Sequence, residues 1–304
     1  FPAGKRFRCD ALWSESGMRF RIRVSEPTGG LGIRSVLSIF VGPHRRSGRD
    51  NPIAVIKSEI AFVRSLSSKK ERAASGLFVA EGEKLVGEML ASEFRVRKIF
   101  RCGEEDRSEA GSVDTERVSP KEMERISALK TPTPVLALIE LPRYRLSAGT
   151  GTDDLALALD GVQDPGNLGT IVRLADWFGI RDIVCSENTA DCFGPKAVQA
   201  TMGAIARVRV HYTALESFLT RAAERGTPVY GTFLEGEDIY RAGLSAGGIV
   251  VMGSEGNGIS SGTARCVTRR LFIPPYPGAA PTSESLNVAM ATAVVAAEFR
   301  RRIR

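Results

Sequence analysis

The feature that most constrains the fold of this chain is the alternation of short apolar runs with helical patterns after residue 154. Leu155–Leu159 is a continuous apolar run, typical of a strand that is buried on both faces of a parallel sheet. Further runs alternate with helical segments, at 182–185, 207–210, 229–233, 248–252 and 270–273. This alternation predicts an α/β domain with a parallel sheet over residues 154–304.

The part of the chain before this domain has a different organisation. Residues 54–148 predict a smaller α/β unit, with strands at 76–80, 97–100 and 134–141 and helices at 57–66, 81–89 and from 120. A polar, basic break is expected at 67–72, and residues 142–153 predict a linker because they are rich in Pro, Ser, Gly and Thr. Residues 1–50 show little periodicity and predict a basic amino-terminal arm, which we expect to be disordered.

Charge and composition exclude several classes of protein. The net charge is +7, but residues 1–50 hold ten Lys and Arg against four Asp and Glu, so the remaining chain is close to neutral. A high isoelectric point of this origin is weak evidence for an anionic partner. No run of eighteen apolar residues is present, so we expect no membrane association.

Cysteine and histidine usage bears on compartment and chemistry. The five cysteines are scattered without a CxxC pair, which predicts a reducing, cytoplasmic location. The chain has only two histidines, His44 and His211, which disfavours both a zinc site and Ser-His-Asp catalysis. We therefore expect no bound metal.

Three segments of the second domain are rich in Gly, Asn, Ser and Glu, and each follows an expected strand. They are 160–173, 250–260 and 271–288. Ligands of open parallel sheets bind at the carboxyl ends of strands, so these segments are the candidate site. GxGxxG and GxxxxGK[ST] are both absent, which argues against a standard dinucleotide site and a P-loop.

Structural interpretations of these residues stay open on spacing alone. Asn167 suits the N-cap of a helix, and Arg173, roughly 9 Å further along the axis, suits a surface ion pair with Asp176. Gly169 would leave room for a ligand beside Arg173. Segment 250–260 is also compatible with a plain loop, and the third segment with a Pro-rich connection in which Ser caps the last helix, expected at about 284–302.

Taken together, the three segments carry an ordered set of motifs. These are Asn167-x-Gly169-x-x-x-Arg173, then Met252-Gly253-x-Glu255-Gly256-x-Gly258, then Ile273-Pro274 with Ser285-Leu286-Asn287-Val288. This set resembles the SpoU (TrmH-type) RNA 2′-O-ribose methyltransferases of the SPOUT superfamily. The resemblance covers about residues 154–300. Residues 54–148, with Phe78-Val79-Ala80-Glu81-Gly82 near their start, resemble the L30e-like RNA substrate-binding domain of that family.

The resemblance implies a fold, a cofactor and partners. The catalytic domain would be a parallel sheet with a trefoil knot, a feature that periodicity does not suggest because knots are rare. S-adenosylmethionine would bind in the knot, mostly through backbone groups, near Thr232, Gly253, Ile273 and Leu286. The substrate would be RNA, ribosomal RNA rather than transfer RNA, and the protein would be a homodimer with its last helix at the interface.

The resemblance also implies roles for individual residues. Arg173 would be the central catalytic residue, with Asn167 and Glu255 orienting it, while Ser285 and Asn287 would position the ribose or the cofactor. Residues 276–281 are an insertion relative to the usual pattern, which makes the shape of the cofactor loop uncertain. RNA contact is expected at a set of basic residues that also suits a solvated surface: Arg64, Lys69, Lys70, Arg72, Arg95, Arg97, Lys98 and Arg101.

Three other functions are compatible with parts of this pattern. A non-catalytic RNA-binding or ribosome-assembly protein could keep the same fold, although the presence of Asn167, Arg173, Glu255 and Asn287 argues against it. A knotted methyltransferase could modify a base instead of a ribose. A nucleotide-binding oxidoreductase is disfavoured because the phosphate-binding fingerprint is absent.

Overall fold

The computed structural model describes residues 57–103, 113–276 and 284–302 with their side chains, and the backbone of three strands before them. These strands are β1 (Arg6–Ser14), β2 (Gly17–Ser25) and β3 (Phe40–Val41), which form an antiparallel sheet that the sequence did not predict. The rest of the predicted arm lies outside the described residues. The chain divides into two units, residues 1–51 and 52–304, and the second carries all of the candidate site.

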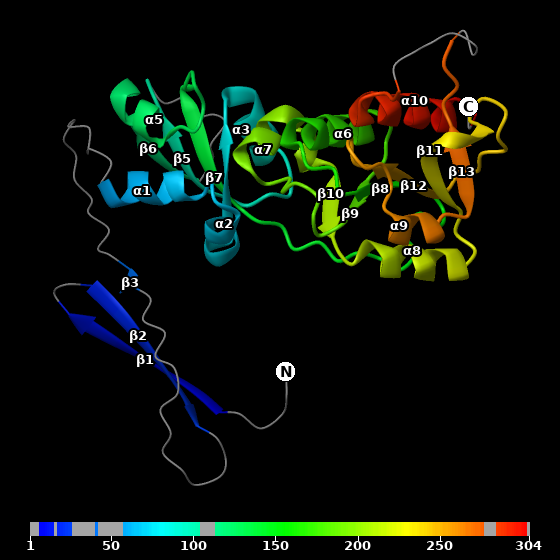
Figure 1. The fold of residues 1–304 in the computed structure, drawn as a ribbon. Coiled ribbons are helices and arrows are strands. Elements are labelled where there is room, and N and C mark those ends of the chain that lie inside the picture. The colour runs from blue at the N-terminus through cyan, green and yellow to red at the C-terminus, as the bar shows by residue number, and fades with distance from the viewer. Residues whose placement is uncertain are drawn as a thin grey trace. The chain divides into compact units, whose positions relative to one another are not determined.

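A six-stranded parallel sheet forms the centre of the carboxyl-terminal half (Figure 1). Its strands are β8 (Leu155–Asp160), β9 (Asp182–Cys185), β10 (Arg209–Tyr212), β11 (Val229–Asp238), β12 (Gly248–Gly253) and β13 (Arg269–Phe272). Their order is β10-β9-β8-β12-β11-β13, and every pair is parallel. The predicted α/β class is therefore confirmed, while the trefoil knot stays a prediction.

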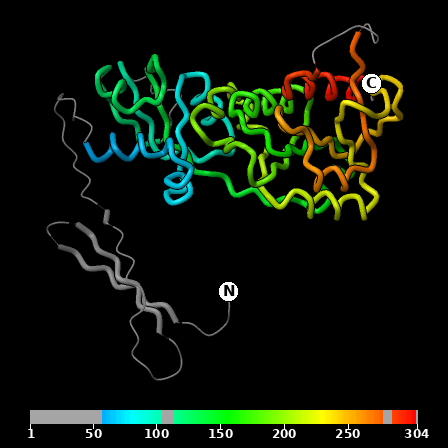
Figure 2. The backbone as a smooth tube through the Cα atoms, viewed as in Figure 1, coloured from blue at the N-terminus to red at the C-terminus, as the bar shows by residue number. Residues whose placement is uncertain are grey.

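Helices cover both faces of this sheet (Figures 1 and 2). On one face lie α6 (Pro165–Trp177) and α10 (Val288–Arg301), and on the other α8 (Leu215–Glu224) and α9 (Ser261–Arg265). The predicted core side of α6 is buried at Leu168, Ile171, Val172 and Ala175. The short helix α7 (Pro195–Thr201) and the 3-10 turn Ala204–Ala206 complete the domain. Apolar strands buried on both faces need this double cover.

The smaller part of the unit is a four-stranded sheet with its own helices. The strand order is β4 (Leu77–Glu81), β7 (Val135–Glu140), β5 (Val96–Arg101) and β6 (Asp114–Arg117). The helices are α1 (Lys57–Ser65), α2 (Lys69–Ser75), α3 (Glu83–Leu90) and α5 (Pro120–Ile126). Ser119 and Glu122 form a capping box at the start of α5, as Ser119-Pro120 predicted in part. The expected break at 67–72 is wrong from residue 69 onward, where α2 begins.

A contiguous core joins this small sheet to the carboxyl-terminal half of the chain. The rings of Phe78 in β4 and Phe193 lie 5.0 Å apart between centroids. Arg72 is only 4% exposed and forms an ion pair of 2.6 Å with Asp191. The predicted domain boundaries stay a prediction, but these contacts show that the two halves pack directly on each other.

None of the helices described here is long and apolar enough to cross a lipid bilayer.

Candidate active site

The site lies where β8 and β12 meet in the sheet. Gly253, the last residue of β12, pairs in register with Asp160, the last residue of β8. From β8 the chain passes outward to β9 and β10, whereas β11 and β13 lie on the other side of β12. A switch in direction of this kind opens a crevice outside the carboxyl ends of the strands, where ligands bind.

The start of α6 is held by a cap that leaves Asn167 free for other contacts. Asp164, not Asn167, is the N-cap, and its carboxylate accepts the Asn167 backbone N–H at 2.8 Å. Lys196 also donates to Asp164 at 2.9 Å, and this hydrogen bond, with the Asn167 N–H, lowers the pKa of Asp164. The N-cap interpretation of Asn167 is therefore wrong.

The Asn167 side chain joins all three motif segments. Its Nδ2 donates to Glu255 Oε1 at 2.5 Å, and its Oδ1 accepts from Asn287 Nδ2 at 3.1 Å. Asn287 Oδ1 also accepts the backbone N–H groups of Ala289 and Met290, which makes Asn287 the N-cap of α10. The expected start of this helix near residue 284, with a Ser cap, is corrected to an Asn cap and a start at Val288.

The Gly-rich segment after β12 folds back on itself. Ser254 and Gly258 exchange backbone hydrogen bonds of 3.0 and 2.9 Å. A Cβ on Gly253 would lie 2.1 Å from the carbonyl carbon of Gly258, so only glycine fits there. The buried carboxylate of Asp160 accepts the Ser260 N–H at 2.8 Å and fixes the end of the turn. Asp160 begins the candidate segment 160–173 but was not predicted as a site residue, although a carboxylate directly after an apolar run was a usable signal.

Arg173 is exposed and has no ion pair within the described residues. Its expected partner, Asp176, is instead bound by Arg207 at 2.9 Å, so the surface ion pair is not formed. Neither Asn167 nor Glu255 hydrogen-bonds to Arg173 in the described structure, in contrast to the orienting role expected for them. The Arg173 guanidinium is therefore available to a ligand.

Gly169 serves packing rather than ligand access. A Cβ at this position would lie 2.4 Å from the Cβ of Ala200 and 2.7 Å from the backbone oxygen of Ala197. Gly169 thus allows the close approach of α6 and α7, and the expectation that it leaves room for a ligand is wrong.

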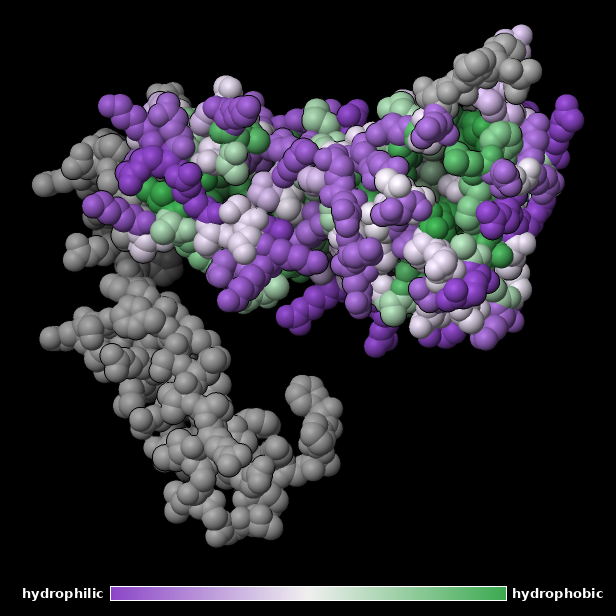
Figure 3. Space-filling view, viewed as in Figure 1, coloured by the Kyte–Doolittle hydropathy of each residue, from purple (hydrophilic) through white to green (hydrophobic). Residues whose placement is uncertain are grey.

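The four expected cofactor contacts lie around the carboxyl ends of β11, β12 and β13. Thr232 pairs in register with Leu271 of β13, and its hydroxyl donates to the Val251 oxygen of β12 at 3.2 Å. Gly253 ends β12, Ile273 directly follows β13, and Leu286, just before α10, is 53% exposed. Hydrophobic surface gathers beside β11 and β12 (Figure 3). Backbone groups at the ends of β12 and β13, with Thr232 of β11 beside them and exposed apolar surface next to them, suit an adenosine.

The remaining expected positions are less constrained. Ser285 is exposed, and its hydroxyl makes no hydrogen bond within the described residues. Residues 277–283, which hold most of the expected insertion, lie outside the described part of the chain.

The basic residues expected to contact RNA divide into two groups. Arg64, Lys69, Lys70, Arg95 and Arg97 are exposed. The other three are held by the protein, and RNA contact by them is not supported. Arg72 is buried against Asp191, Lys98 bridges two carboxylates at 2.5 Å each, and Arg101 is 19% exposed beside Glu83. Burial lowers the pKa of Lys98, but the hydrogen bonds to Glu116 and Glu59 outweigh it and raise the pKa overall.

Comparisons with known proteins agree with this geometry. The SpoU rRNA Methylase family model matches residues 154–297, and the MRM3-like substrate binding domain model matches residues 57–137. The chain is 31% identical over 241 residues to the 23S rRNA (guanosine(2553)-2′-O)-methyltransferase RlmP of Bacillus subtilis, covering 78% of this chain and 94% of the relative.

Two solved structures are similar over most of their length. A TrmH-family protein from Porphyromonas gingivalis superposes with a TM-score of 0.75 at 41% identity, covering 82% of this chain and 99% of the other. An AdoMet-bound rRNA methyltransferase from Sinorhizobium meliloti superposes with a TM-score of 0.74 at 28% identity, covering 83% and 98%.

Proposed function

Because this chain belongs to the SpoU rRNA methylase family, we propose that it methylates a ribose 2′-hydroxyl of ribosomal RNA, with S-adenosylmethionine as methyl donor. The observation that carries this proposal is the convergence of Asn167, Glu255 and Asn287 at the carboxyl edge of the sheet. These residues are far apart in the chain, and they meet beside the strand ends that suit the cofactor.

Arg173 carries the central role in the proposed mechanism. When bound, S-adenosylmethionine supplies a methyl group on a sulfonium, which is already activated toward a nucleophile. The ribose 2′-hydroxyl is a weak acid, so the protein must stabilise the negative charge that develops on its oxygen. A guanidinium stays protonated and cannot serve as an ordinary base. The exposed, unpaired Arg173 instead donates hydrogen bonds to the developing alkoxide or to the adjacent phosphate.

The three hydrogen-bonded side chains act as positioning residues. Asn167 links α6, which carries Arg173, to the Gly-rich segment through Glu255 and to the start of α10 through Asn287. This arrangement holds the helix of Arg173 in a fixed place relative to the cofactor site, which rate acceleration by orientation requires. Ser285, exposed three residues before the start of α10, would contact the ribose or the cofactor.

Thr232, Gly253, Ile273 and Leu286 are the residues we assign to the cofactor. Thr232 within β11 and the backbone groups at the ends of β12 and β13 would bind its polar atoms, while Ile273 and Leu286 would contact the adenine ring. The backbone of Gly253 lies close to the backbone of Gly258, and this contact fixes the shape of the cofactor surface beside β12.

The experiment uses the full chain, methyl-labelled S-adenosylmethionine, and unmodified ribosomal and transfer RNA in separate reactions. Label is expected in ribosomal RNA, in dinucleotides that resist alkaline hydrolysis, because a 2′-O-methyl group blocks cleavage of the next phosphodiester. Label in mononucleotides would show base methylation, and label in transfer RNA alone would contradict the proposed substrate. Cofactor binding without any label would call for the same assay on ribosomal subunits, and no label there would contradict the proposal.

A homodimer through the catalytic domain is also part of the proposal. Trp177 of α6 is 84% exposed and Met290 of α10 is 56% exposed, although both are large and apolar. The two helices pack side by side, with Asn287 bound to Asn167 at their starts and Arg300 bound to the Phe178 oxygen at their ends. An exposed apolar surface on two neighbouring helices is typical of a subunit interface.

Light scattering coupled to gel filtration tests this interface. The wild-type chain is expected to elute as a dimer, and Trp177→Asp as a monomer, because a charge in the interface would lose its hydration. Tyr240→Asp, at an aromatic residue that is 50% exposed elsewhere, serves as the control and should remain a dimer. A dimeric Trp177→Asp variant would exclude this surface.

The cytoplasm is the compartment we propose. Cys102, Cys185, Cys192 and Cys266 are free thiols, which suits a reducing environment.

A further inference from the structure

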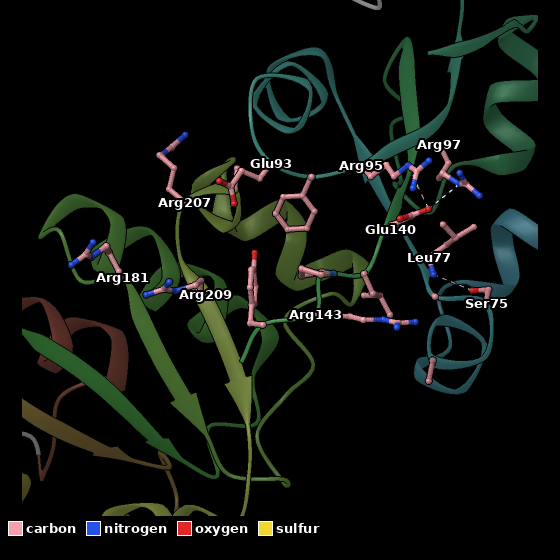
Figure 4. A pocket seen from close by; sticks show the side chains of 17 residues that line it. Ser75, Leu77, Glu93, Arg95, Arg97, Glu140, Arg143, Arg181, Arg207 and Arg209 are labelled. Atoms are coloured by element: carbon pink, nitrogen blue, oxygen red, sulfur yellow. Dashed lines mark hydrogen bonds and ion pairs between the residues drawn. The ribbon is translucent and has the colours of Figure 1, made fainter. Parts of the chain in front are cut away.

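A cavity of about 1030 Å³ lies at the junction of the small sheet and the catalytic half of the chain (Figure 4). Residues from five parts of the chain line it: the end of α2 with the start of β4, β5 with its preceding loop, the end of β7 with the segment after it, and the amino-terminal ends of β9 and of β10. Six arginines lie in this lining, namely Arg95, Arg97, Arg143, Arg181, Arg207 and Arg209. We refer to these six residues as the arginine groove.

The arginine groove has more positive charge than the protein itself compensates. Its lining holds only two carboxylates, Glu93 and Glu140. Glu140 is shared by Arg97 at 3.1 Å and Arg95 at 4.0 Å, so neither arginine has a carboxylate of its own. The side chains of Arg143 and Arg181 are exposed and have no ion pair among the described residues.

The two other arginines are anchored by carboxylates outside the lining. Arg207 binds Asp176 and Glu88, and Arg209 donates to Asp182 through Nε at 2.9 Å and through Nη2 at 2.7 Å. Arg209 thus keeps Nη1 available for a ligand, whereas the donors of Arg207 are largely occupied. The free charge of the groove therefore centres on Arg143 and Arg181, with Arg95, Arg97 and Arg209 around them.

We propose that the arginine groove binds the phosphate backbone of the substrate RNA, at nucleotides other than the one that is methylated. Guanidinium groups match the phosphate oxygens of successive phosphodiesters in a two-pronged geometry. Phe94 and Tyr144 also line the cavity, and both are half-buried, so each offers part of an aromatic ring to an unpaired base. This inference rests on the proposed function.

The position of the groove separates binding from chemistry. Arg181 directly precedes β9, and Arg209 is the first residue of β10, so both lie on the side of the sheet where the amino-terminal ends of the parallel strands are. The motif residues follow the carboxyl ends of β8 and β12, at the opposite edge. Loss of groove contacts is therefore expected to weaken RNA binding while leaving the methyl transfer step and the cofactor site unchanged.

The test compares two double variants with the wild-type chain. Arg143→Ala with Arg181→Ala removes the two unpaired arginines without leaving a carboxylate unpartnered. Arg221→Ala with Arg265→Ala is the matched control, because both are exposed arginines outside the groove and the loss of charge is the same. The measurements are KM and kcat with unmodified 23S rRNA transcribed in vitro, the salt dependence of RNA binding, and the Kd of S-adenosylmethionine.

The groove variant is expected to raise KM about tenfold. Because two phosphate contacts are lost, the plot of the logarithm of the RNA association constant against log salt concentration should become shallower, with the magnitude of its slope smaller by about 2. Its kcat and cofactor Kd should equal those of the control. Equal KM and salt slope for the two variants would overturn the inference, as would a fall in kcat at unchanged KM. If the wild-type chain transfers no methyl group to 23S rRNA or to ribosomal subunits, the proposed function fails, and the RNA-binding measurement still tests the groove.

Discussion

At the scale of single residues, the site separates a reacting group from the groups that position it. Arg173 is exposed and unpaired among the described residues, whereas Asn167, Glu255 and Asn287 hold one another. Removal of Arg173 should therefore affect chemistry alone. Changes in the hydrogen-bonded group should affect both chemistry and the local structure, because Asn287 also caps α10.

Arg173→Ala is expected to lower kcat for RNA methylation at least 100-fold, within the range of about 2.7–4 kcal/mol lost when a charge-stabilising donor is removed. The Kd of S-adenosylmethionine, measured by calorimetry, should stay within twofold of the wild-type value. Near-normal turnover of this variant would show that Arg173 is not the catalytic residue.

Substitution of Asn287 can separate its two roles. Asn287→Asp keeps an oxygen to cap α10 but loses the Nδ2 donor to Asn167, so activity should fall at least tenfold with little change in stability. Asn287→Ala also loses the cap and should lower the free energy of unfolding by about 0.5–2 kcal/mol. Equal activities of Asn287→Asp and the wild-type chain would remove Asn287 from the positioning group.

At the scale of elements, the approach of α6 to α7 depends on one glycine. Gly169 lies in the middle of α6, where glycine is unfavourable for a helix by roughly 1 kcal/mol relative to alanine. A larger residue does not fit at this position, because an added Cβ would lie only 2.4 Å from the Cβ of Ala200. Helix α6 carries both Asn167 and Arg173, so this packing also places the site.

Gly169→Ala is expected to lower the free energy of unfolding by about 1–3 kcal/mol, because the added methyl group overpacks a contact with backbone. Gly87→Ala is the matched control, since Gly87 also lies inside a helix but an added Cβ would meet nothing within 4 Å. The control should be stabilised by about 0.5–1 kcal/mol. Urea unfolding of both variants measures the difference, and a neutral Gly169→Ala would contradict the packing argument.

At the scale of the whole unit, Arg72 ties the small sheet to the catalytic half. Besides its ion pair with Asp191, Arg72 donates to the backbone oxygens of Leu66 and Ser67 at 2.6 and 2.8 Å. The side-chain amide of Gln199 in α7 donates to the backbone oxygen of Glu81 in β4 at 2.7 Å. These contacts give a physical reason for both halves to unfold together.

Arg72→Ala is expected to lower the free energy of unfolding by about 3–5 kcal/mol, because removal of the buried cation leaves the Asp191 carboxylate without its counter-charge. Arg241→Ala is the control, since the side chain of Arg241 is 88% exposed in its pair with Asp238 and should contribute less than about 1 kcal/mol. Equal midpoints in urea for the two variants would show that Arg72 does not stabilise the junction.

Local pattern determined the class of fold and the three candidate segments, while the resemblance to a known family selected the motif residues within them. The run Leu155–Leu159 predicts a buried parallel strand because a short, continuous apolar run is typical of a strand that is covered on both faces. The structure buries all five residues. The strand expected at 270–273 is β13 (Arg269–Phe272), one residue earlier in the chain. Elements without such a signal, β6 and α2, were missed because they are short and polar.

Only the tertiary structure decided which partners these residues have. Asn167 meets Glu255 across 88 positions and Asn287 across 120, and Arg72 meets Asp191 across 119. No local pattern carries such pairings, since they depend on the strand order that brings β8 beside β12 and α6 beside α10. The same holds for Gly169, whose neighbour Ala200 lies on another helix, and for the arginine groove, which forms only where the two halves meet.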